Sequence, residues 1–175
     1  MKRHAAATMS LDELNAQDAR GFASALDGVF EHSPWIVART LDARPFASID
    51  ALHDALLATL DRATADEQLA LLRAHPELAG KAAIARALTP SSTSEQASAG
   101  LDACTPAEFA ELGALNERYR ERFGFPFIIA VRGLDRRQII AALATRVMRT
   151  RDVEFREALA QVGRIARLRL EALLT

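Results

Sequence analysis

Residues 105–131 read TPAEFAELGALNERYRERFGFPFIIAV, and this stretch decides the fold. Its start, Thr105-Pro106-Ala107-Glu108, is a capping box with proline at the first helical position, which is a strong helix start. The apolar residues that follow recur at steps of three and four, and they are Phe109, Leu112, Leu115, Tyr119 and Phe123. We therefore expect a long helix that buries this stripe against other helices.

The composition of the 175-residue chain extends this expectation to the whole fold. Alanine (36 residues) and leucine (23 residues) are among the best helix formers, and the length fits one domain. A net charge of −1 argues against a strongly basic nucleic-acid binder. The single cysteine, Cys104, excludes an internal disulfide framework and a multi-cysteine metal site, and we interpret it as a buried bystander.

We expect an all-α fold: one compact domain of about eight or nine helices over residues 10–175, after a disordered tail of residues 1–9. The Thr89–Ser94 stretch is predicted to be a loop from its composition. No apolar run reaches the ~18 residues that a membrane span needs, and no signal peptide is found, so a cytoplasmic protein is expected. Further helix starts are predicted at Ser10, Asp18 (towards Phe30), Ser33-Pro34, Ser48, Asp66, Asp135 and near Asp152.

Residues 124–131, GFPFIIAV, break the helical pattern. They carry no charge, contain Pro126 and have β-favouring residues after it, so we expect an extended and buried segment. Buried N–H groups must find partners. Either neighbouring groups of the protein satisfy them, or a ligand does.

Among the four histidines, His75 is the one best suited to chemistry. Pro76 forces the preceding helix to end at His75, and a chain break there can project the ring into a cleft. An imidazole has the ordinary pKa that best suits proton transfer near neutral pH. A purely structural role for the ring is the alternative.

Ser92, Glu95 and Gln96 also have two interpretations. Ser92-x-x-Glu95 and Thr93-x-x-Gln96 are overlapping capping boxes, so ordinary helix capping explains them. Alternatively, the free amides of a helix start and the Gln96 carboxamide receive a carboxylate or a urea-like group. Glu95 would then accept or relay a proton.

Arg169 lies on an apolar stripe of the last predicted helix. Steps of three and four lead from Phe155 through Val162 to Arg169, whereas Arg164 and Arg167 lie off this stripe. An arginine there either extends its head to water or has an anionic partner, because a buried unpaired charge is very costly. If the head is buried, its planar fork suits a carboxylate.

The charges are distributed unevenly along the chain. From Arg118 onward there are 13 basic and 6 acidic residues, and before it there are 9 basic and 17 acidic residues. Either the two parts complement each other within the molecule, or the C-terminal third faces an anion.

Five segments in order resemble one known family, the 2-oxo-4-hydroxy-4-carboxy-5-ureidoimidazoline (OHCU) decarboxylases. They read FEHSPW (30–35), RAHPELAG (73–80), SEQASAGL (94–101), FGFPFIIA (123–130) and IARLRL (165–170). The resemblance covers about residues 11–174. It implies an all-helical homodimer without metal or organic cofactor, which converts OHCU to (S)-allantoin with loss of CO2, the last step of urate degradation to allantoin.

The resemblance also implies roles for single residues. His75 is the proton donor, and we add the hypothesis that Glu95 takes part in catalysis by polarising His75 if the two meet. The substrate-binding residues are Pro76, Ser92, Glu95, Gln96, Phe127, Ile128, Ile129, Ala130, Val131 and Arg169. The partner is the small molecule OHCU, and no nucleic acid or membrane is expected. Two alternatives stay open: a small helical hydrolase using His75 and Glu95, and a non-enzymatic helical interaction module.

Overall fold

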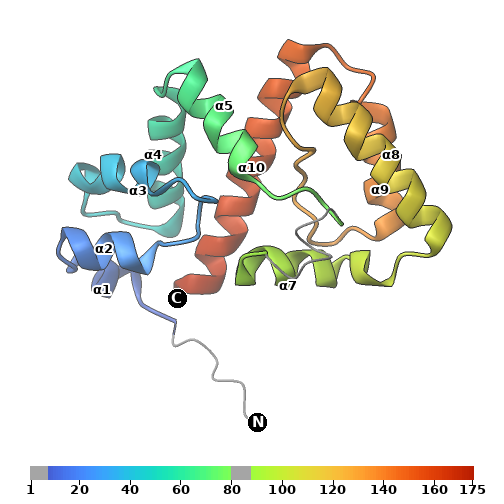
Figure 1. The fold of residues 1–175 in the computed structure, drawn as a ribbon. Coiled ribbons are helices and arrows are strands. Elements are labelled where there is room, and N and C mark those ends of the chain that lie inside the picture. Colours follow the sequence, from blue (N-terminus) through green and yellow to red (C-terminus); the bar gives the residue numbers. More distant parts are fainter. Residues whose placement is uncertain (1–7, 80–87) are drawn as a thin grey trace, which may run out of the picture. The chain divides into compact units, whose positions relative to one another are not determined.

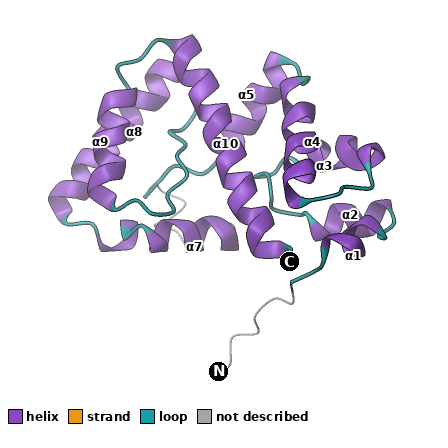
Figure 2. Cartoon of the chain, turned by 180° about the vertical axis from the view of Figure 1, so that it is seen from behind, coloured by secondary structure: helices purple, strands orange, loops and turns teal. Residues whose placement is uncertain are grey.

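The computed structural model describes residues 8–79 and 88–175, and these residues confirm the all-α prediction. Within them, helices joined by loops form the structure without a named strand (Figure 2). The α-helices, labelled in Figure 1, are α1 (Leu11–Asn15), α2 (Ala19–Ala25), α3 (Pro34–Thr40), α4 (Ile49–Asp61), α5 (Ala65–Ala74), α7 (Pro90–Ser98), α8 (Pro106–Phe123), α9 (Arg136–Arg146) and α10 (Arg151–Leu173). Two 3₁₀ helices are η1 (Leu41–Ala43) and η2 (Leu101–Ala103).

The chain packs as two compact units. Unit 1 consists of the residues up to Thr64 together with Gly163–Thr175, and unit 2 consists of Ala65–Val162. Helix α10 therefore contributes its beginning to unit 2 and its end to unit 1. The single domain expected from the chain length contains two packing units.

Most predicted helix starts are confirmed by their caps. The side chains of Ser10, Asp18, Ser48, Thr105 and Asp135 each accept a hydrogen bond from the N–H group three residues later. The hydroxyl of Ser33 makes no such bond, and Pro34 alone marks the start of α3. Helix α2 ends at Ala25, earlier than predicted.

The loop predicted at Thr89–Ser94 is wrong, because most of this stretch is the start of α7. Thr89 is the N-cap, its Oγ accepts from the N–H of Ser92 at 3.3 Å, and Pro90 takes the first helical position. This is the same Thr-Pro start that begins α8. Ser92 and Thr93 consequently lie inside the helix and do not cap it.

Unit 2 has an aromatic core built from α8 and the segment after it. The ring of Tyr119 lies 4.6 Å from that of Phe123 and 5.3 Å from that of Phe127, measured between centroids. Helices α8 and α9 lie side by side (Figure 1). The predicted stripe of α8 is correct except at its beginning, where Phe109 is 42% exposed.

The segment 124–131 is extended and largely buried, as predicted. It begins at Gly124, whose φ of 79° ends α8 in the left-handed conformation that glycine adopts at low cost. Its N–H group donates to the carbonyl of Arg120 at 2.8 Å. The turn directs the following residues back along the aromatic core.

In unit 1 the apolar faces of α1 to α4 form the core, with Phe22, Leu52 and Leu56 fully buried. Of the predicted tail, residues 1–7 lie outside the described residues. Met9 forms a parallel bridge to Leu174, so the prediction of disorder is wrong at this residue. None of the helices in the described parts of the chain has the length and apolar character to span a membrane.

Candidate active site

The ring of His75 is held in a fixed orientation at the end of α5. Its Nδ1 atom lies 2.9 Å from the carbonyl oxygen of Leu71, one turn earlier, and the residue is 8% exposed. Because a carbonyl can only accept, Nδ1 carries the hydrogen in this bond. Nε2 is therefore the ring nitrogen that can exchange a proton with another group.

The turn that follows His75 is anchored to two helices. The carbonyl of Leu78 accepts a hydrogen bond from Nδ2 of Asn116 in α8 at 2.9 Å. The N–H of Ala79 donates to Oε1 of Gln96 in α7 at 2.9 Å, and Ala79 has a positive φ of 49°. These two bonds fix the backbone after Pro76, which is half-buried.

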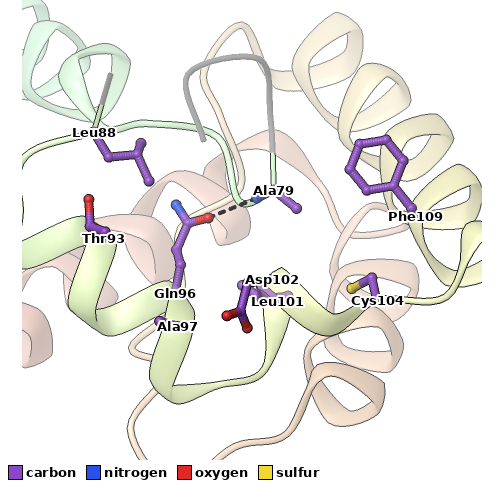
Figure 3. A pocket seen from close by; sticks show the side chains of 9 residues that line it. All are labelled: Ala79, Leu88, Thr93, Gln96, Ala97, Leu101, Asp102, Cys104 and Phe109. Carbon is purple, nitrogen blue, oxygen red and sulfur yellow. Dashed lines mark hydrogen bonds between the residues drawn. The ribbon is translucent and has the colours of Figure 1, made fainter. Parts of the chain in front are cut away.

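Helix α7 presents the three predicted polar residues. Ser92 and Gln96, one turn apart, are buried, and Glu95 is half-buried. The bond from Ala79 fixes the carboxamide of Gln96, so that its oxygen points to Ala79 and its nitrogen to the other side (Figure 3). Within residues 8–79 and 88–175, that buried nitrogen, Nε2, has no hydrogen-bond partner, and buried donors of this kind need an acceptor.

Gln96 lines a cavity of about 390 Å³ in unit 2 (Figure 3). Apolar side chains form much of its wall, and Asp102 and Cys104 contribute polar atoms. Cys104 is half-buried and free, so it is less covered than predicted. Burial first, and the Glu108 carboxylate second, raise the pKa of its thiol above the ordinary value.

The extended segment has partners for some of its backbone groups. The N–H of Ala130 donates to Oε1 of Gln161 at 2.9 Å, and the carbonyl of Ile128 accepts from Arg146 at 2.9 Å. Neighbouring side chains thus satisfy part of the segment, in agreement with the first of the two sequence interpretations. Phe127, Ile128 and Val131 are buried, whereas Ile129 and Ala130 are half-buried.

A buried charged network supports this segment. Arg146 donates through Nε to Oε1 of Glu154 at 2.7 Å, and the hydroxyl of Tyr119 donates to the same oxygen at 2.6 Å. The guanidinium of Arg146 also lies 4.5 Å from the ring centroid of Phe127. Burial first, and the bond to Glu154 second, raise the pKa of Tyr119 far above its ordinary value, so the phenol stays a neutral donor.

Arg169 belongs to unit 1 and has an anionic partner there. Its Nη2 donates to Oε1 of Glu31 at 3.1 Å, and its Nη1 donates to the carbonyl of Gly28 at 2.8 Å. The side chains of Arg169 and Glu31 are 7% and 2% exposed. The sequence alternative of a head extended to water is wrong, because the guanidinium is buried against a carboxylate.

His75, the α7 residues and the extended segment all belong to unit 2. The bond between Ala79 and Gln96 joins the turn after His75 to α7. Gln96 lines the cavity described above, whereas neither His75 nor residues 127–131 are among its described lining residues.

Several supporting residues were missed by the sequence analysis: Glu31, Asn116, Arg146, Glu154 and Gln161. Three of them follow the spacing that singled out Arg169. Asn116 lies between Leu112 and Tyr119 on α8, and Arg146 and Gln161 continue the buried faces of α9 and α10. These three residues could have been found from the sequence, because each is a polar residue on an apolar stripe.

Comparison with known proteins identifies the family of the chain. The family model described as OHCU decarboxylase matches residues 15–171. The chain belongs to the OHCU decarboxylase family. The chain is 42% identical over 165 residues to the 2-oxo-4-hydroxy-4-carboxy-5-ureidoimidazoline decarboxylase of Halalkalicoccus jeotgali, covering 94% of this chain and 92% of the relative.

A second relative with the same name, from Haloferax volcanii, is 41% identical over 93% of this chain and 94% of its own length. Among solved structures, a crystal structure of (S)-allantoin synthase matches with a TM-score of 0.74 and 31% identity over 95% of this chain. This chain spans about half (54%) of that protein's length. The OHCU decarboxylase resemblance expected from the five motifs is confirmed.

Proposed function

We propose that this protein is a carboxy-lyase that converts OHCU to (S)-allantoin in urate degradation. The observation that carries the proposal is the buried His75, whose Nδ1 is committed to the Leu71 carbonyl in a chain of the OHCU decarboxylase family. In this arrangement Nε2 is the ring nitrogen to which we assign the proton transfer that the reaction requires.

The chemistry of the substrate explains why so few groups suffice. The bond from the ring carbon to the carboxylate breaks, CO2 leaves, and the electron pair remains on the ring carbon. The adjacent unsaturated nitrogen delocalises this pair, so the substrate itself supplies the electron sink that a cofactor would otherwise provide. A proton added to one face of the neighbouring ring carbon, which bears the ureido group, and transfer of the hydroxyl proton to the ring nitrogen then complete (S)-allantoin, with the carbon that lost CO2 becoming a carbonyl carbon.

The polar residues of unit 2 fit the remaining tasks. His75, carrying hydrogen on both ring nitrogens, gives the proton from Nε2 and becomes neutral, and Glu95 assists the proton transfer. Gln96, through its orphaned Nε2, donates to a carbonyl oxygen of the ureido group or the ring. Ser92, Pro76 and segment 127–131 complete the binding surface, as the family resemblance implies. Positioned general acid catalysis contributes about 10²–10⁴-fold.

Arg169 is proposed to orient the substrate carboxylate. The planar fork of a guanidinium suits two carboxylate oxygens. The support for this role is the match of Arg169 to the C-terminal motif of the family.

Optical activity tests the proposed function. OHCU is generated from urate in place, the protein is added, and circular dichroism is followed over time. Rapid formation of one enantiomer of allantoin is the expected result. A slow, racemic product at the rate of the protein-free sample would reject the proposal.

Two further measurements separate the alternatives. A hydrolase would consume water without releasing CO2, so CO2 release is measured alongside the optical signal. An interaction module would show no effect of (S)-allantoin on thermal stability, whereas an enzyme that binds its product is stabilised by it.

We also propose that the protein is a cytoplasmic homodimer. The support is the family resemblance, together with three large apolar side chains that are exposed in unit 2: Phe109, Met148 and Val153.

A further inference from the structure

The extended segment of unit 2 has two edges with different surroundings. In extended backbone, the N–H and C=O groups of one residue point to one side, and those of the next residue point to the other. Ile128 and Ala130 therefore share one edge. Ile129 presents its N–H and C=O groups at the opposite edge.

The edge of Ile128 and Ala130 is occupied by two buried side chains. Arg146 of α9 donates to the carbonyl of Ile128, and Gln161 of α10 accepts from the N–H of Ala130, both at 2.9 Å. Arg146 and Gln161 are 4% and 5% exposed. Bonds of this kind inside a core are strongly directional, and losing one partner leaves a buried group unsatisfied.

A continuous ladder of polar groups holds these two side chains. Nε2 of Gln161 donates to Glu157 at 2.7 Å, and Nη1 of Arg149 lies 3.7 Å from Glu157 and 3.6 Å from Glu154. Glu154 in turn binds Arg146. The ladder gives Gln161 one orientation, with its nitrogen committed to Glu157 and its oxygen to Ala130.

The opposite edge is different. Across residues 8–79 and 88–175, no hydrogen bond engages the backbone N–H or C=O of Ile129, which is only half-buried. Polar backbone groups in such a place need an acceptor or donor from water or from a ligand.

We propose that Gln161 and Arg146 are positioning residues, which hold one edge of the segment so that the Ile129 backbone faces the ligand with its donor and acceptor. They act through the segment and do not touch the substrate. This proposal rests on the proposed decarboxylase function. It gives a positioning role to Arg146 of α9 and Gln161 of α10, which lie outside segment 127–131.

Gln161 offers a matched pair of variants. Gln161→Met keeps the volume of the side chain but removes the acceptor for Ala130. The exchange Glu157→Gln with Gln161→Glu keeps the acceptor, the bond between the two side chains and the net charge. Arg164→Ala, an exposed change on the same helix, serves as the control.

For Gln161→Met we expect KM for OHCU, and Kd for (S)-allantoin by calorimetry, to rise about tenfold. We expect kcat to change by less than about threefold. The exchanged variant restores both constants to within about threefold of the wild type. Wild-type affinity in Gln161→Met, or an exchanged variant as defective as Gln161→Met, would overturn the proposal.

Backbone NMR on the unmodified protein tests the same idea without any substitution. On addition of (S)-allantoin, the amide signal of Ile129 should shift, and that of Ala130 should stay protected from hydrogen exchange with and without the ligand. A rapidly exchanging Ala130 amide, or an unperturbed Ile129 amide in a protein that binds allantoin, contradicts the proposal. If the wild-type protein formed racemic allantoin at the rate of the protein-free sample, the decarboxylase function itself would be rejected.

Discussion

The imidazole of His75 makes two separable contributions, one through each ring nitrogen. Nδ1 bonds to the Leu71 carbonyl and holds the ring, whereas Nε2 is proposed to deliver the proton. In His75→Asn the side-chain amide can still donate to Leu71, but no group remains at the position of Nε2. We expect kcat to fall about 10²–10⁴-fold with an unchanged melting temperature, measured by circular dichroism of product and of protein.

A His75→Asn variant that keeps kcat within a few-fold of the wild type would remove His75 as the acid. His53 supplies the control, since its Nε2 lies 2.9 Å from the carbonyl of Gly163 in unit 1. His53→Asn should alter stability without a specific loss of kcat.

Arg169 and Glu31 form the buried ion pair of unit 1, and each charge depends on the other. Arg169→Met should lower the free energy of unfolding by about 3–5 kcal/mol, because the Glu31 carboxylate loses its guanidinium. Adding Glu31→Leu should restore much of this loss. If Arg169 also orients the substrate, the double variant regains stability but keeps a strongly raised KM.

Urea unfolding and steady-state kinetics on the two single variants and the double variant complete this cycle. A double variant with wild-type KM would show that Arg169 serves the fold of unit 1 alone.

The sequence allowed some buried polar residues to be predicted, because they lie on apolar stripes of helices. The spacing singled out Arg169 as a residue that either extends its head to water or has an anionic partner, and the structure shows the partner to be Glu31. The identity of such a partner could not be predicted, because Glu31 lies 138 positions away in the chain. The same limit applies to Gln161 and Ala130, which only the tertiary fold brings together.

At the scale of elements, the start of α7 controls the placement of Ser92 and Gln96. Thr89→Ala removes the N-cap and should lower the free energy of unfolding by about 1 kcal/mol. Because the first turn then frays, KM should rise as well. Urea unfolding and kinetics measure the two effects.

Thr105→Ala is the matched change at the start of α8, with the same Thr-Pro sequence. It should lose a similar stability and leave KM unchanged. An equal rise of KM in both variants would show that the effect is global and is not specific to α7.

The capping box of α8 should make this element sensitive to acid. The backbone bond from Thr105 first, and the bond from Arg136 second, lower the pKa of Glu108. A lowered pKa in the folded state stabilises the protein above the ordinary value near pH 4.3. That contribution is lost as the pH falls through the folded pKa.

Glu108→Gln should therefore flatten the decline of unfolding free energy between about pH 5 and pH 3, measured by urea titration. Glu111→Gln, an exposed change on the same helix, should not. A variant that declines as steeply as the wild type would show that Glu108 contributes nothing to acid unfolding.

The sequence predicted most elements because their caps and apolar spacing are local. The error at α7 arose because Ser and Thr are common in loops, whereas here Thr89 and Pro90 supply the start and Ser92 and Thr93 only continue the helix. The extended segment was predicted from its proline and its lack of charge. Its hydrogen-bond partners were not predictable, because they come from α9 and α10.

For the molecule as a whole, the uneven charges are matched internally. Within the described residues, five arginines of the basic C-terminal third pair with acidic residues from earlier in the chain, and the pairs are Arg120–Glu77, Arg136–Glu108, Arg137–Glu108, Arg167–Asp50 and Arg169–Glu31. These pairs favour the alternative of internal complementarity over that of a surface that faces an anion.

The two packing units could not be predicted, because their border runs through the continuous helix α10. The sequence carries one local sign of this border, Gly163, which is the first residue of α10 in unit 1. A Cβ atom there would lie 3.1 Å from Leu57, so glycine allows α10 and α4 to approach closely. A glycine inside a helix indicates such a contact without identifying the partner.

The proposed homodimer can be tested by the mass of the whole molecule in solution. Sedimentation equilibrium should give twice the 19.1 kDa mass of the chain at micromolar concentration. Since a large exposed apolar side chain favours burial in an interface, Met148→Asp should shift the equilibrium towards the monomer if Met148 lies there. A wild-type chain that stays monomeric contradicts the dimer.

The bridge between Met9 and Leu174 has a practical consequence. The N–H of Met9 donates to the carbonyl of Leu173, and the N–H of Thr175 donates to the carbonyl of Met9, both within 3.1 Å. The last residue, Thr175, therefore lies beside Met9. Circular permutation requires two such segments close together in space. A short glycine linker from Thr175 to Thr8 would close the ring and keep Met9 in the bridge, and an exposed connection elsewhere could then be cut to provide new ends.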